Sequence, residues 1–563
     1  MSRMTVTFDE DKQDKKLDEF RKKEEEDIAQ IVASRHGLEY VDLMPVPINM
    51  DALRLIPEAE AIEAKVAGFS LVGKHIKVAV VSPVHEKSIQ VVDRLTKAGY
   101  DVVVTVASPT SLAKAWARYK DLSFSTETKA GALEVSSEEI KGFLAEIKTI
   151  EDVKKQILEI IKLKKGFRIS KILEIVLSGA LATKASDIHI EPEEDYARLR
   201  YRLDGMLTDI ASFDLETFGL ILSRIKLLSG LKLNIKTEAQ DGRFSVHIAD
   251  DIEIRTSILP GAYNESIVLR LLNPKSIQVP LEDLGIPEKL LKILLEQIEK
   301  PNGMVLTTGP TGSGKTTTLY AFLRKVYNPG VKIITIEDPI EYHLPGIVQT
   351  QVNVDKDYTF ALGLRSALRQ DPDIIMVGEI RDEETAKIAV DSAETGHLVF
   401  STLHTNSAAG SFPRLIDLGI NPKTMTSAIN IALAQRLVRK LCEKCKKERP
   451  MNTEEKKYVD GILSELSDPT SKEGIQHEKI WDSVGCVECN MLGYKGRIGI
   501  YEAILTDEAL EEAVRGKASE REIRKATKKQ GILSMEEDGI LKVLKGITSL
   551  DELRRIIELG TEV

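Results

Sequence analysis

Residues 309–316, Gly-Pro-Thr-Gly-Ser-Gly-Lys-Thr, constrain the fold of this chain more than any other stretch. They complete the pattern G-x-x-x-x-G-K-[ST], follow the apolar run "MVL" and precede the helix-like segment "TTLYAFL". In this strand–loop–helix context the backbone N–H groups of a glycine-rich loop surround phosphates at a helix N-terminus. A chance glycine-rich turn would rarely also have the lysine, the threonine and both flanks. The sequence therefore predicts a parallel α/β sheet that binds a nucleoside triphosphate.

The residues of this loop have distinct expected roles. Lys315 is expected to contact the β- and γ-phosphates of ATP, and the Thr316 hydroxyl is expected to ligate Mg²⁺. The remaining nucleotide contacts are assigned to Gly309, Pro310, Thr311, Gly312, Ser313, Gly314, Thr317 and, after the next strand, Asp338.

Two further apolar runs, "IITI" and "IIMV", end in acidic side chains. Because the carboxyl ends of parallel strands meet at one edge of a sheet, these acids are expected beside the phosphate loop. A glycine stands where many ATPases place a metal-binding aspartate, so Glu379 is expected to act on Mg²⁺ through water. Water activation is then expected from Glu337, with Glu341 as the next candidate. Helix capping is the structural alternative, and "RDEETAKIAV" allows it for Asp382.

Two histidines flank the next apolar strand, "LVFSTL". His404 follows the strand and His397 precedes it. At the end of such a strand an imidazole can hydrogen-bond a phosphate or a catalytic carboxylate. Both are therefore candidates for sensing the nucleotide, although a lone histidine beside a strand is more often a structural residue.

The cysteines form two Cys-x-x-Cys pairs that use all four cysteines of the chain. In a cytosolic protein this spacing predicts a closed tetrahedral Zn²⁺ site rather than disulfides. A redox pair is the alternative, but a thioredoxin-like context is lacking. The expected ligands are Cys442, Cys445, Cys486 and Cys489.

Composition narrows the class of protein. Hydrophobic residues make up 42% of the chain, but no run of about 18 apolar residues predicts a membrane-spanning helix. The opening segment "MSRMTVTFDEDKQDKKLDEF" has no apolar core of a signal peptide, so a cytoplasmic location is expected. A net charge of −10 and 5% aromatic residues argue against direct nucleic-acid binding.

Periodicity divides the chain into five segments. We expect a charged tail, helical or disordered, at 1–30, a small α/β domain at 31–120, a linker that ends in a helix at 121–165, and an α+β domain with antiparallel strands at 166–275. An ATPase domain follows at 276–563, and it includes a zinc-binding subdomain at 440–500 and C-terminal helices.

Several motifs together resemble those of the secretion ATPases of type II secretion and type IV pilus assembly. They are "GPTGSGKTTT", "TIEDPIE", "LRQDPDIIMVGEIRDEETA", "TGHLVFSTLHTN", "AQRLVRKLCEKC" and "GYKGRIGIYE". The resemblance runs from about residue 31 onward, is most specific across 183–505, and is closer to the pilus assembly ATPases than to the retraction ATPases, which lack the tetracysteine insertion. It implies a cytoplasmic homo-hexameric Mg-ATPase, peripheral to the inner membrane, with a RecA-like motor domain preceded by a PAS-like domain.

The resemblance also implies roles outside the motor domain. The family's PAS-like sheet packs on a neighbouring subunit's motor domain, so hydrolysis is expected between subunits. The segment "IEIRTSILPGAYNESIVLRLL" matches the one that carries arginine fingers, which points to Arg255 and Arg270 as groups that neutralise phosphate charge. Pairing of these arginines with surface carboxylates is the structural alternative. Asn264 departs from the family, in which glycine is usual.

The N-terminal domain is implied to dock on an inner-membrane platform protein. Some relatives bind cyclic di-GMP through a motif that opens with Arg-Leu-Gly; we find no such motif, and the ligand is not predicted.

Two other classes compete with this interpretation. A nucleic-acid translocase or helicase also combines phosphate loops with zinc sites, but the acidic charge disfavours it. A regulatory ATP-binding scaffold is disfavoured by the intact Lys315, Thr316 and Glu379. Type IV pilus assembly and type II secretion share these motifs, so both remain open.

Overall fold

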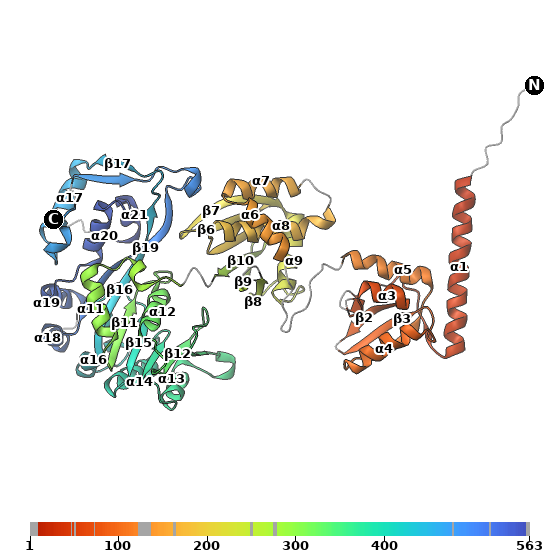
Figure 1. Cartoon of the computed structure of the whole chain (residues 1–563), viewed down its shortest axis with the longest axis horizontal. Coiled ribbons are helices and arrows are strands. Elements are labelled where there is room, and N and C mark those ends of the chain that lie inside the picture. The colour runs from red at the N-terminus through yellow and green to blue at the C-terminus, as the bar shows by residue number, and fades with distance from the viewer. Residues whose placement is uncertain are drawn as a thin grey trace, which may run out of the picture. The chain divides into compact units, whose positions relative to one another are not determined.

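The computed structural model comprises two units, Met1–Thr126 and Glu127–Val563 (Figure 1). The described residues are 10–46, 48–49, 52–53, 55–72, 74–121, 137–161, 165–247, 251–273, 278–475, 478–516 and 519–558. Among them, none of the helices combines the length and the apolar character that a membrane crossing requires.

The first unit is built on a four-stranded sheet in the order β1-β4-β3-β2, with β1, β4 and β3 parallel and β2 antiparallel to β3. Its helices bury apolar faces such as Val91 and Leu95 of α4 against the sheet. The charged segment expected at 1–30 is helical from Glu10 onward, and residues 1–9 lie outside the described part. The elements are α1 (Glu10–His36), β1 (Glu39–Tyr40), α3 (Glu58–Ala64), β2 (Val66–Val72), β3 (His75–Val80), α4 (Glu86–Lys97), β4 (Asp101–Val106) and α5 (Pro109–Ala117).

The second unit opens with a six-stranded antiparallel sheet in the order β7-β6-β5-β10-β9-β8. Strand residues alternate between its faces, so Ile188, Tyr201 and Leu269 point into one apolar core with the helices. The opposite face therefore carries the polar alternate residues. The elements are α8 (Lys165–Ala182), β5 (Asp187–Pro192), β6 (Tyr196–Leu203), β7 (Met206–Asp214), α9 (Leu215–Leu228), β8 (Gln240–His247), β9 (Asp251–Gly261) and β10 (Asn264–Leu272).

Part of the segment expected as a linker belongs to this core. Helices α6 (Ser137–Glu146) and α7 (Ile150–Ile161) bury Ile140, Val153 and Ile157 against α8 and the sheet. A linker ending in one helix was expected at 121–165, whereas residues 137–161 form two helices that belong to the core, because these helices place isoleucines and valines on one face. Residues 122–136 and 162–164 lie outside the described part.

A seven-stranded sheet in the order β13-β12-β14-β15-β11-β16-β19 follows, and it is parallel except for the β16–β19 pair. Its central strands are buried on both faces: Met304 and Leu306 of β11 face one core, and Val305 faces the other. The elements are α11 (Glu288–Ile298), β11 (Gly303–Thr308), α12 (Lys315–Val326), β12 (Ile333–Glu337), β13 (Val348–Gln351), α13 (Phe360–Leu368), β14 (Ile374–Val377), α14 (Glu383–Glu394), β15 (Leu398–Leu403), α15 (Ser411–Asp417), α16 (Pro422–Ala428), β16 (Ile429–Leu441) and β19 (Tyr494–Leu505).

The connection between β16 and β19 carries the cysteines, and four helices follow β19. The C-terminal helix α20 is buried on nearly all sides and joins the larger core of the sheet through Ile540 and Val543. The elements are β17 (Lys447–Pro450), α17 (Thr453–Ser464), β18 (Lys479–Asp482), α18 (Glu508–Gly516), α19 (Glu520–Thr527), α20 (Met535–Leu544) and α21 (Leu550–Ile556). The mixed α/β architecture that the sequence predicts is confirmed.

Candidate active site and metal centre

The phosphate loop joins β11 to α12, and glycines make its tight path possible. Gly309 has a φ of +151° and Gly314 a φ of +93°, conformations that L-residues rarely adopt. A Cβ atom on Gly309 would also lie 2.5 Å from Ser313 Oγ. Lys315 begins α12, and its Nζ donates hydrogen bonds to the carbonyl oxygens of Gly309 (2.8 Å) and Pro310 (3.2 Å). The ammonium group thus lies over the loop, where it can reach a bound phosphate.

The other residues predicted to contact the nucleotide lie in or beside this loop. The loop residues Thr311 and Gly312 are exposed, and Thr316 and Thr317 are half-buried on the first turn of α12. Asp338 is exposed directly after β12. These positions agree with the predicted roles but do not test them.

Glu379 and His404 come together at the carboxyl edge of the sheet. Register aligns the ends of β14 and β15 next to each other, and His404 Nε2 lies 3.0 Å from Glu379 Oε2. Arg381 Nη2 lies 2.5 Å from the other oxygen of Glu379, whose side chain is only 12% exposed. Burial lowers the pKa of Lys315, and the negative charge of Glu379 opposes this shift. Glu379 therefore lies within electrostatic reach of the phosphate-loop lysine, as predicted.

Glu337 is buried at the end of β12, with 3% of its surface exposed. The Tyr320 hydroxyl donates a hydrogen bond to its carboxylate, as do Thr335 Oγ1 (2.5 Å) and Gln349 Nε2 (3.1 Å). Three donors occupy both oxygens, so this carboxylate is held in place rather than free to accept a proton from water.

Glu341 has different surroundings. Burial raises its pKa, and the positive charges of Arg255 and Arg270 oppose the shift. Arg255 Nη1 lies 3.6 Å from Glu341 Oε2, and Arg255 Nη2 donates a hydrogen bond of 3.0 Å to the carbonyl oxygen of Ile340. A carboxylate with a raised pKa is a stronger base than an ordinary one, which suits Glu341 to general-base chemistry.

Three arginines form a row across the outer face of the six-stranded sheet. Arg243 of β8 is paired in register with Arg255 of β9, which is paired with Arg270 of β10. Arg270 Nε donates a 3.0 Å hydrogen bond to Asp187 Oδ1 of β5. The row lines a cavity of about 1170 Å³ whose other wall holds the segment from Asp338 to Tyr342. We call Arg243, Arg255 and Arg270 the arginine row.

Sequence reasoning missed Arg243, although "QDGRFSVHI" reads as an alternating strand. Arg243 belongs to the arginine row because of the register in which β8 pairs with β9, and periodicity alone does not predict that register. Sequence reasoning also missed Gln435 and Arg436 on β16, the neighbour of β11. Gln435 Nε2 donates to the Ser313 carbonyl (2.8 Å), and the charge of Arg436 contributes to the lowered pKa of Lys315.

His397 does not reach this site within the chain. It precedes β15 at the amino edge of the sheet, where its carbonyl accepts a hydrogen bond from Gly303 N and its Nδ1 lies 3.1 Å from the Ser392 carbonyl. His397 and His404 lie at opposite ends of the same strand, and the nucleotide role expected for His397 stays a prediction. Asp382 caps α14 by accepting a hydrogen bond from Thr385 N (2.8 Å), as the sequence allows.

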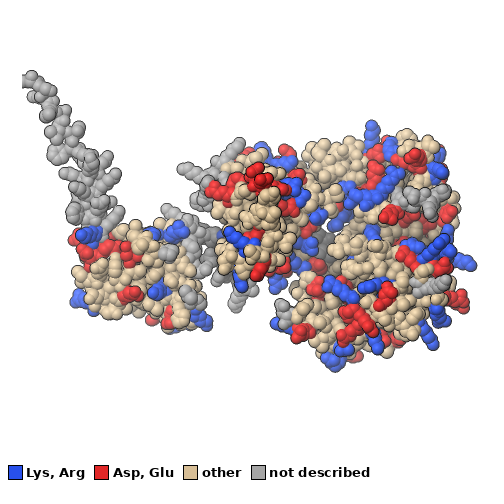
Figure 2. All heavy atoms as spheres, turned by 180° about the vertical axis from the view of Figure 1, so that it is seen from behind, with Lys and Arg blue, Asp and Glu red and all other residues tan. Residues whose placement is uncertain are grey.

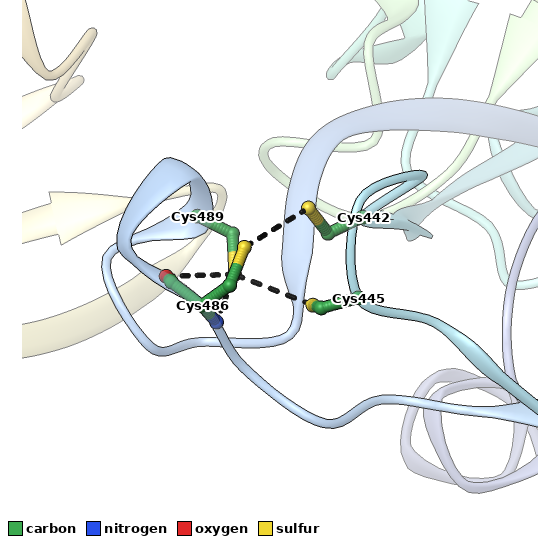
Figure 3. Close-up of side chains that lie close together, drawn as sticks. All are labelled: Cys442, Cys445, Cys486 and Cys489. Carbon is green, nitrogen blue, oxygen red and sulfur yellow. Dashed lines mark hydrogen bonds between the residues drawn. The ribbon is translucent and has the colours of Figure 1, made fainter.

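The four cysteine sulfurs converge between the two turns that follow β16 and precede β19 (Figure 3). Three pairs of sulfur atoms are 3.7–3.8 Å apart, and all four lie within 4.8 Å of one another. A tetrahedron with Zn–S bonds of about 2.3 Å has sulfur–sulfur edges of about 3.8 Å, so the donor set fits Zn²⁺. The backbone N–H groups of Gly485 and Gly493 donate to Cys445 Sγ and Cys489 Sγ, as is typical around metal-bound thiolates.

The fold and the phosphate loop define a RecA-like P-loop nucleotide-binding protein. Residues 162–555 match the family model described as "Type II/IV secretion system protein", and residues 36–126 match the MshEN domain. The chain belongs to the type II/IV secretion system protein family, and it is an ATPase of the secretion and pilus-assembly class, as its motifs predict.

Two relatives show the extent of the similarity. Type II secretion system protein E of Aeromonas hydrophila is 45% identical over 389 residues, which cover 69% of this chain and 75% of the relative. The type IV pilus assembly ATPase PilB of Myxococcus xanthus is 36% identical over 533 residues, 94% of this chain and 91% of the relative. Among solved structures, the Legionella pneumophila ATPase DotB covers 68% of this chain and 94% of its own, with 23% identity and a TM-score of 0.48.

Proposed function

We propose that this chain is a Mg²⁺-dependent ATPase that acts as a cytoplasmic homo-hexamer beneath the inner membrane and powers the assembly of pilin or pseudopilin subunits. The observation that carries the proposal is the convergence of Lys315 and the Glu379–His404 pair on one sheet edge. The arginine row and Glu341 share a cavity that reaches Asp338, directly after the neighbouring strand β12.

Each residue has a step in hydrolysis. The loop N–H groups and Lys315 bind the phosphates, and the Thr316 hydroxyl would hold Mg²⁺, which would neutralise phosphate charge. Glu379, held in place by Arg381 and His404, would act on this metal through water. Glu341 accepts the proton of the attacking water, and Glu337, fixed by three donors, keeps the end of β12 in place. The choice of Glu341 over Glu337 rests on its raised pKa.

The arginine row supplies positive charge as the terminal phosphate leaves. The sequence led us to expect these arginines at a site between subunits. The contacts of Arg255 with Glu341 and Ile340 of its own chain support the other arrangement, in which each chain brings its arginines to its own nucleotide. Closure of the arginine row on the motor domain would then couple hydrolysis to movement, and a hexamer would transmit that movement.

Type IV pilus assembly is the favoured pathway. A relative that spans nearly the whole chain is a type IV pilus assembly ATPase. The unit at Met1–Thr126, which includes the MshEN match, is proposed to dock on an inner-membrane platform protein, and the four cysteines are proposed to hold Zn²⁺. The predicted division into a docking domain, a PAS-like domain at 166–275 and a motor domain at 276–563 is proposed on the same basis.

Direct binding of nucleic acid is not part of the proposal. On the face drawn in Figure 2, Lys and Arg side chains are interspersed with Asp and Glu, which does not favour a phosphate backbone.

The test is ATP hydrolysis measured against protein concentration, with native mass determination, for wild type, Lys315→Ala and Glu379→Gln. We expect activity that needs Mg²⁺ and rises with hexamer formation, loss of nucleotide binding in Lys315→Ala, and retained binding without turnover in Glu379→Gln. Absence of hydrolysis by the wild-type hexamer, or strong stimulation by DNA, would refute the proposal.

A further inference from the structure

Each residue of the loop after β15 is held in place by a hydrogen bond to another element. Five consecutive residues, His404 to Ala408, each have a hydrogen-bond partner on a different element of the second unit. Two of these partners belong to the nucleotide edge: His404 pairs with Glu379 (3.0 Å), and the Thr405 hydroxyl lies 2.6 Å from that of Thr308 at the end of β11. This segment, residues 404–408, is called the histidine loop below.

The other three residues are held by charged side chains from the C-terminal part of the chain. Arg436 Nη2 of β16 donates to the Asn406 carbonyl oxygen (2.8 Å). The Ser407 hydroxyl donates to Glu520 Oε1 of α19 (2.6 Å), and Ala408 N donates to Glu502 Oε1 of β19 (2.8 Å). Ser407 and Ala408 are buried, so these bonds are shielded from water and hold the backbone firmly.

Arg524 of α19 joins two of these anchors. Its Nη2 lies 3.0 Å from Glu520 Oε1, and its Nη1 lies 3.4 Å from Glu502 Oε2. Burial alone would lower the pKa of Arg524, but the two carboxylates reverse the shift and raise it, so the guanidinium stays charged. Arg524 and its partner Glu502 both line a cavity of about 410 Å³.

We propose that Arg524, acting through Glu502 and Glu520, is a positioning residue for His404, and that α19 thereby sets the rate of hydrolysis. The geometry supports this role because the histidine loop is short and its far end is tied to two carboxylates that a single guanidinium holds together. Loss of Arg524 leaves Glu520 and Glu502 as neighbouring negative charges without their shared cation. The histidine loop then shifts, and the Glu379–His404 contact loosens. This inference rests on the proposed ATPase function.

The test compares kcat and ATP affinity in the full-length protein. Arg524→Ala should lower kcat about tenfold, as expected for a small misplacement of a catalytic group, while ATP affinity stays near that of wild type. Arg524→Lys should recover activity only in part, because an ammonium does not match two carboxylates as a guanidinium fork does. The matched control is Arg521→Ala, an exposed arginine on the same helix, which should leave kcat unchanged.

Two further measurements separate positioning from a general loss of structure. In a His404→Ala background, Arg524→Ala should have no additional effect, whereas a merely structural role would lower kcat further. If Arg524→Ala does not fold, the Ser407→Ala and Glu520→Ala variants serve instead. Each should lower kcat, and the double variant should be no worse than Glu520→Ala alone, because Glu520→Ala already removes the bond to Ser407.

The inference is overturned if Arg524→Ala, or Glu520→Ala in its place, hydrolyses ATP at the wild-type rate. It is also overturned if Arg521→Ala is equally impaired, or if the effects of Arg524→Ala and His404→Ala add. If the wild-type protein itself does not hydrolyse ATP, the proposed function fails instead, so the two failures are distinguishable.

Discussion

Arg255 Nη1 lies 3.6 Å from Glu341 Oε2, and both residues belong to the same chain. The arginine comes from the six-stranded sheet and the glutamate from the segment after β12, so the contact connects the two halves of the second unit. Arg255 also donates to the Ile340 carbonyl, so its guanidinium, beside the half-buried Glu341, is held against the wall of the cavity. This contact is the basis for placing phosphate-neutralising charge in the same chain as the phosphate loop.

The effect of replacing one arginine of the row on turnover should follow how closely that arginine contacts the motor half. Arg255→Ala should lower kcat at least about 100-fold, because a positive charge aimed at developing phosphate charge contributes that much or more. Arg255→Lys should not restore it, since Lys lacks the planar fork. Arg198→Ala is the matched control: Arg198 lies on the same sheet but pairs with Glu193 (3.1 Å). Equal loss in the control would point to damage of the sheet.

The dependence of ATP hydrolysis on pH should show whether Glu341 is the general base. Its pKa is raised above the usual 4.5 by burial, so hydrolysis should rise with pH through a limb that lies above the ordinary carboxyl range. Below this pKa the carboxyl group is protonated, and it can neither accept a proton from water nor pair with Arg255. The variant Glu341→Gln should be slow at all pH values and should lack the limb. A limb that persists in Glu341→Gln would assign the base to another group.

The two histidines should differ sharply in function. His404→Gln should lower kcat, because it removes the imidazole at 3.0 Å from Glu379 Oε2. His397→Gln should leave kcat within about twofold of wild type, since its ring contacts the Ser392 carbonyl at the opposite edge of the sheet. Steady-state kinetics at saturating ATP decides between them. A large loss in His397→Gln would show that this edge of the sheet also takes part in hydrolysis.

Removal of the metal should lower the stability of the fold rather than act directly on ATP hydrolysis. One Zn²⁺ per chain is expected, and chelation or Cys445→Ser should lower the Tm, because structural zinc contributes directly to folding free energy. The cysteine turn also contacts the six-stranded half: Asn490 Oδ1 accepts from Ile150 N (2.9 Å), and Asp204 Oδ2 accepts from Gly496 N (2.8 Å). Hydrogen exchange should therefore increase at the start of α7. An unchanged Tm and unchanged exchange in Cys445→Ser would contradict a structural metal.

The motor domain could be predicted because each of its sequence motifs consists of residues that are close together in the chain. The phosphate loop, the buried strands that end in Glu337 and Glu379, and the paired cysteines are all read from neighbouring residues. Because β14 and β15 are neighbouring parallel strands, Glu379 and His404, which follow them, lie together at one edge of the sheet.

What escaped prediction depends on contacts between distant segments. Arg243 joins Arg255 only through strand register, and Gln435 reaches the phosphate loop only because β16 inserts beside β11. His397 lies at the opposite end of β15 from His404, and its role at the nucleotide stays a prediction. A linker ending in one helix was expected at 121–165 because the sequence is rich in charge, whereas both α6 and α7 bury isoleucines and valines in the core.

The most direct test of the central claim, that each chain brings its own arginine to its own nucleotide, is a mixing experiment. Lys315→Ala and Arg255→Ala proteins, each expected to be inactive, are mixed under conditions in which subunits exchange, and ATP hydrolysis is measured. Wild type mixed with the double variant serves as control, because it shows whether mixed assemblies can turn over at all. With that control active, our account predicts no recovery, because no chain then holds both residues. Recovery of hydrolysis would contradict it and show that the site is completed by a neighbouring subunit.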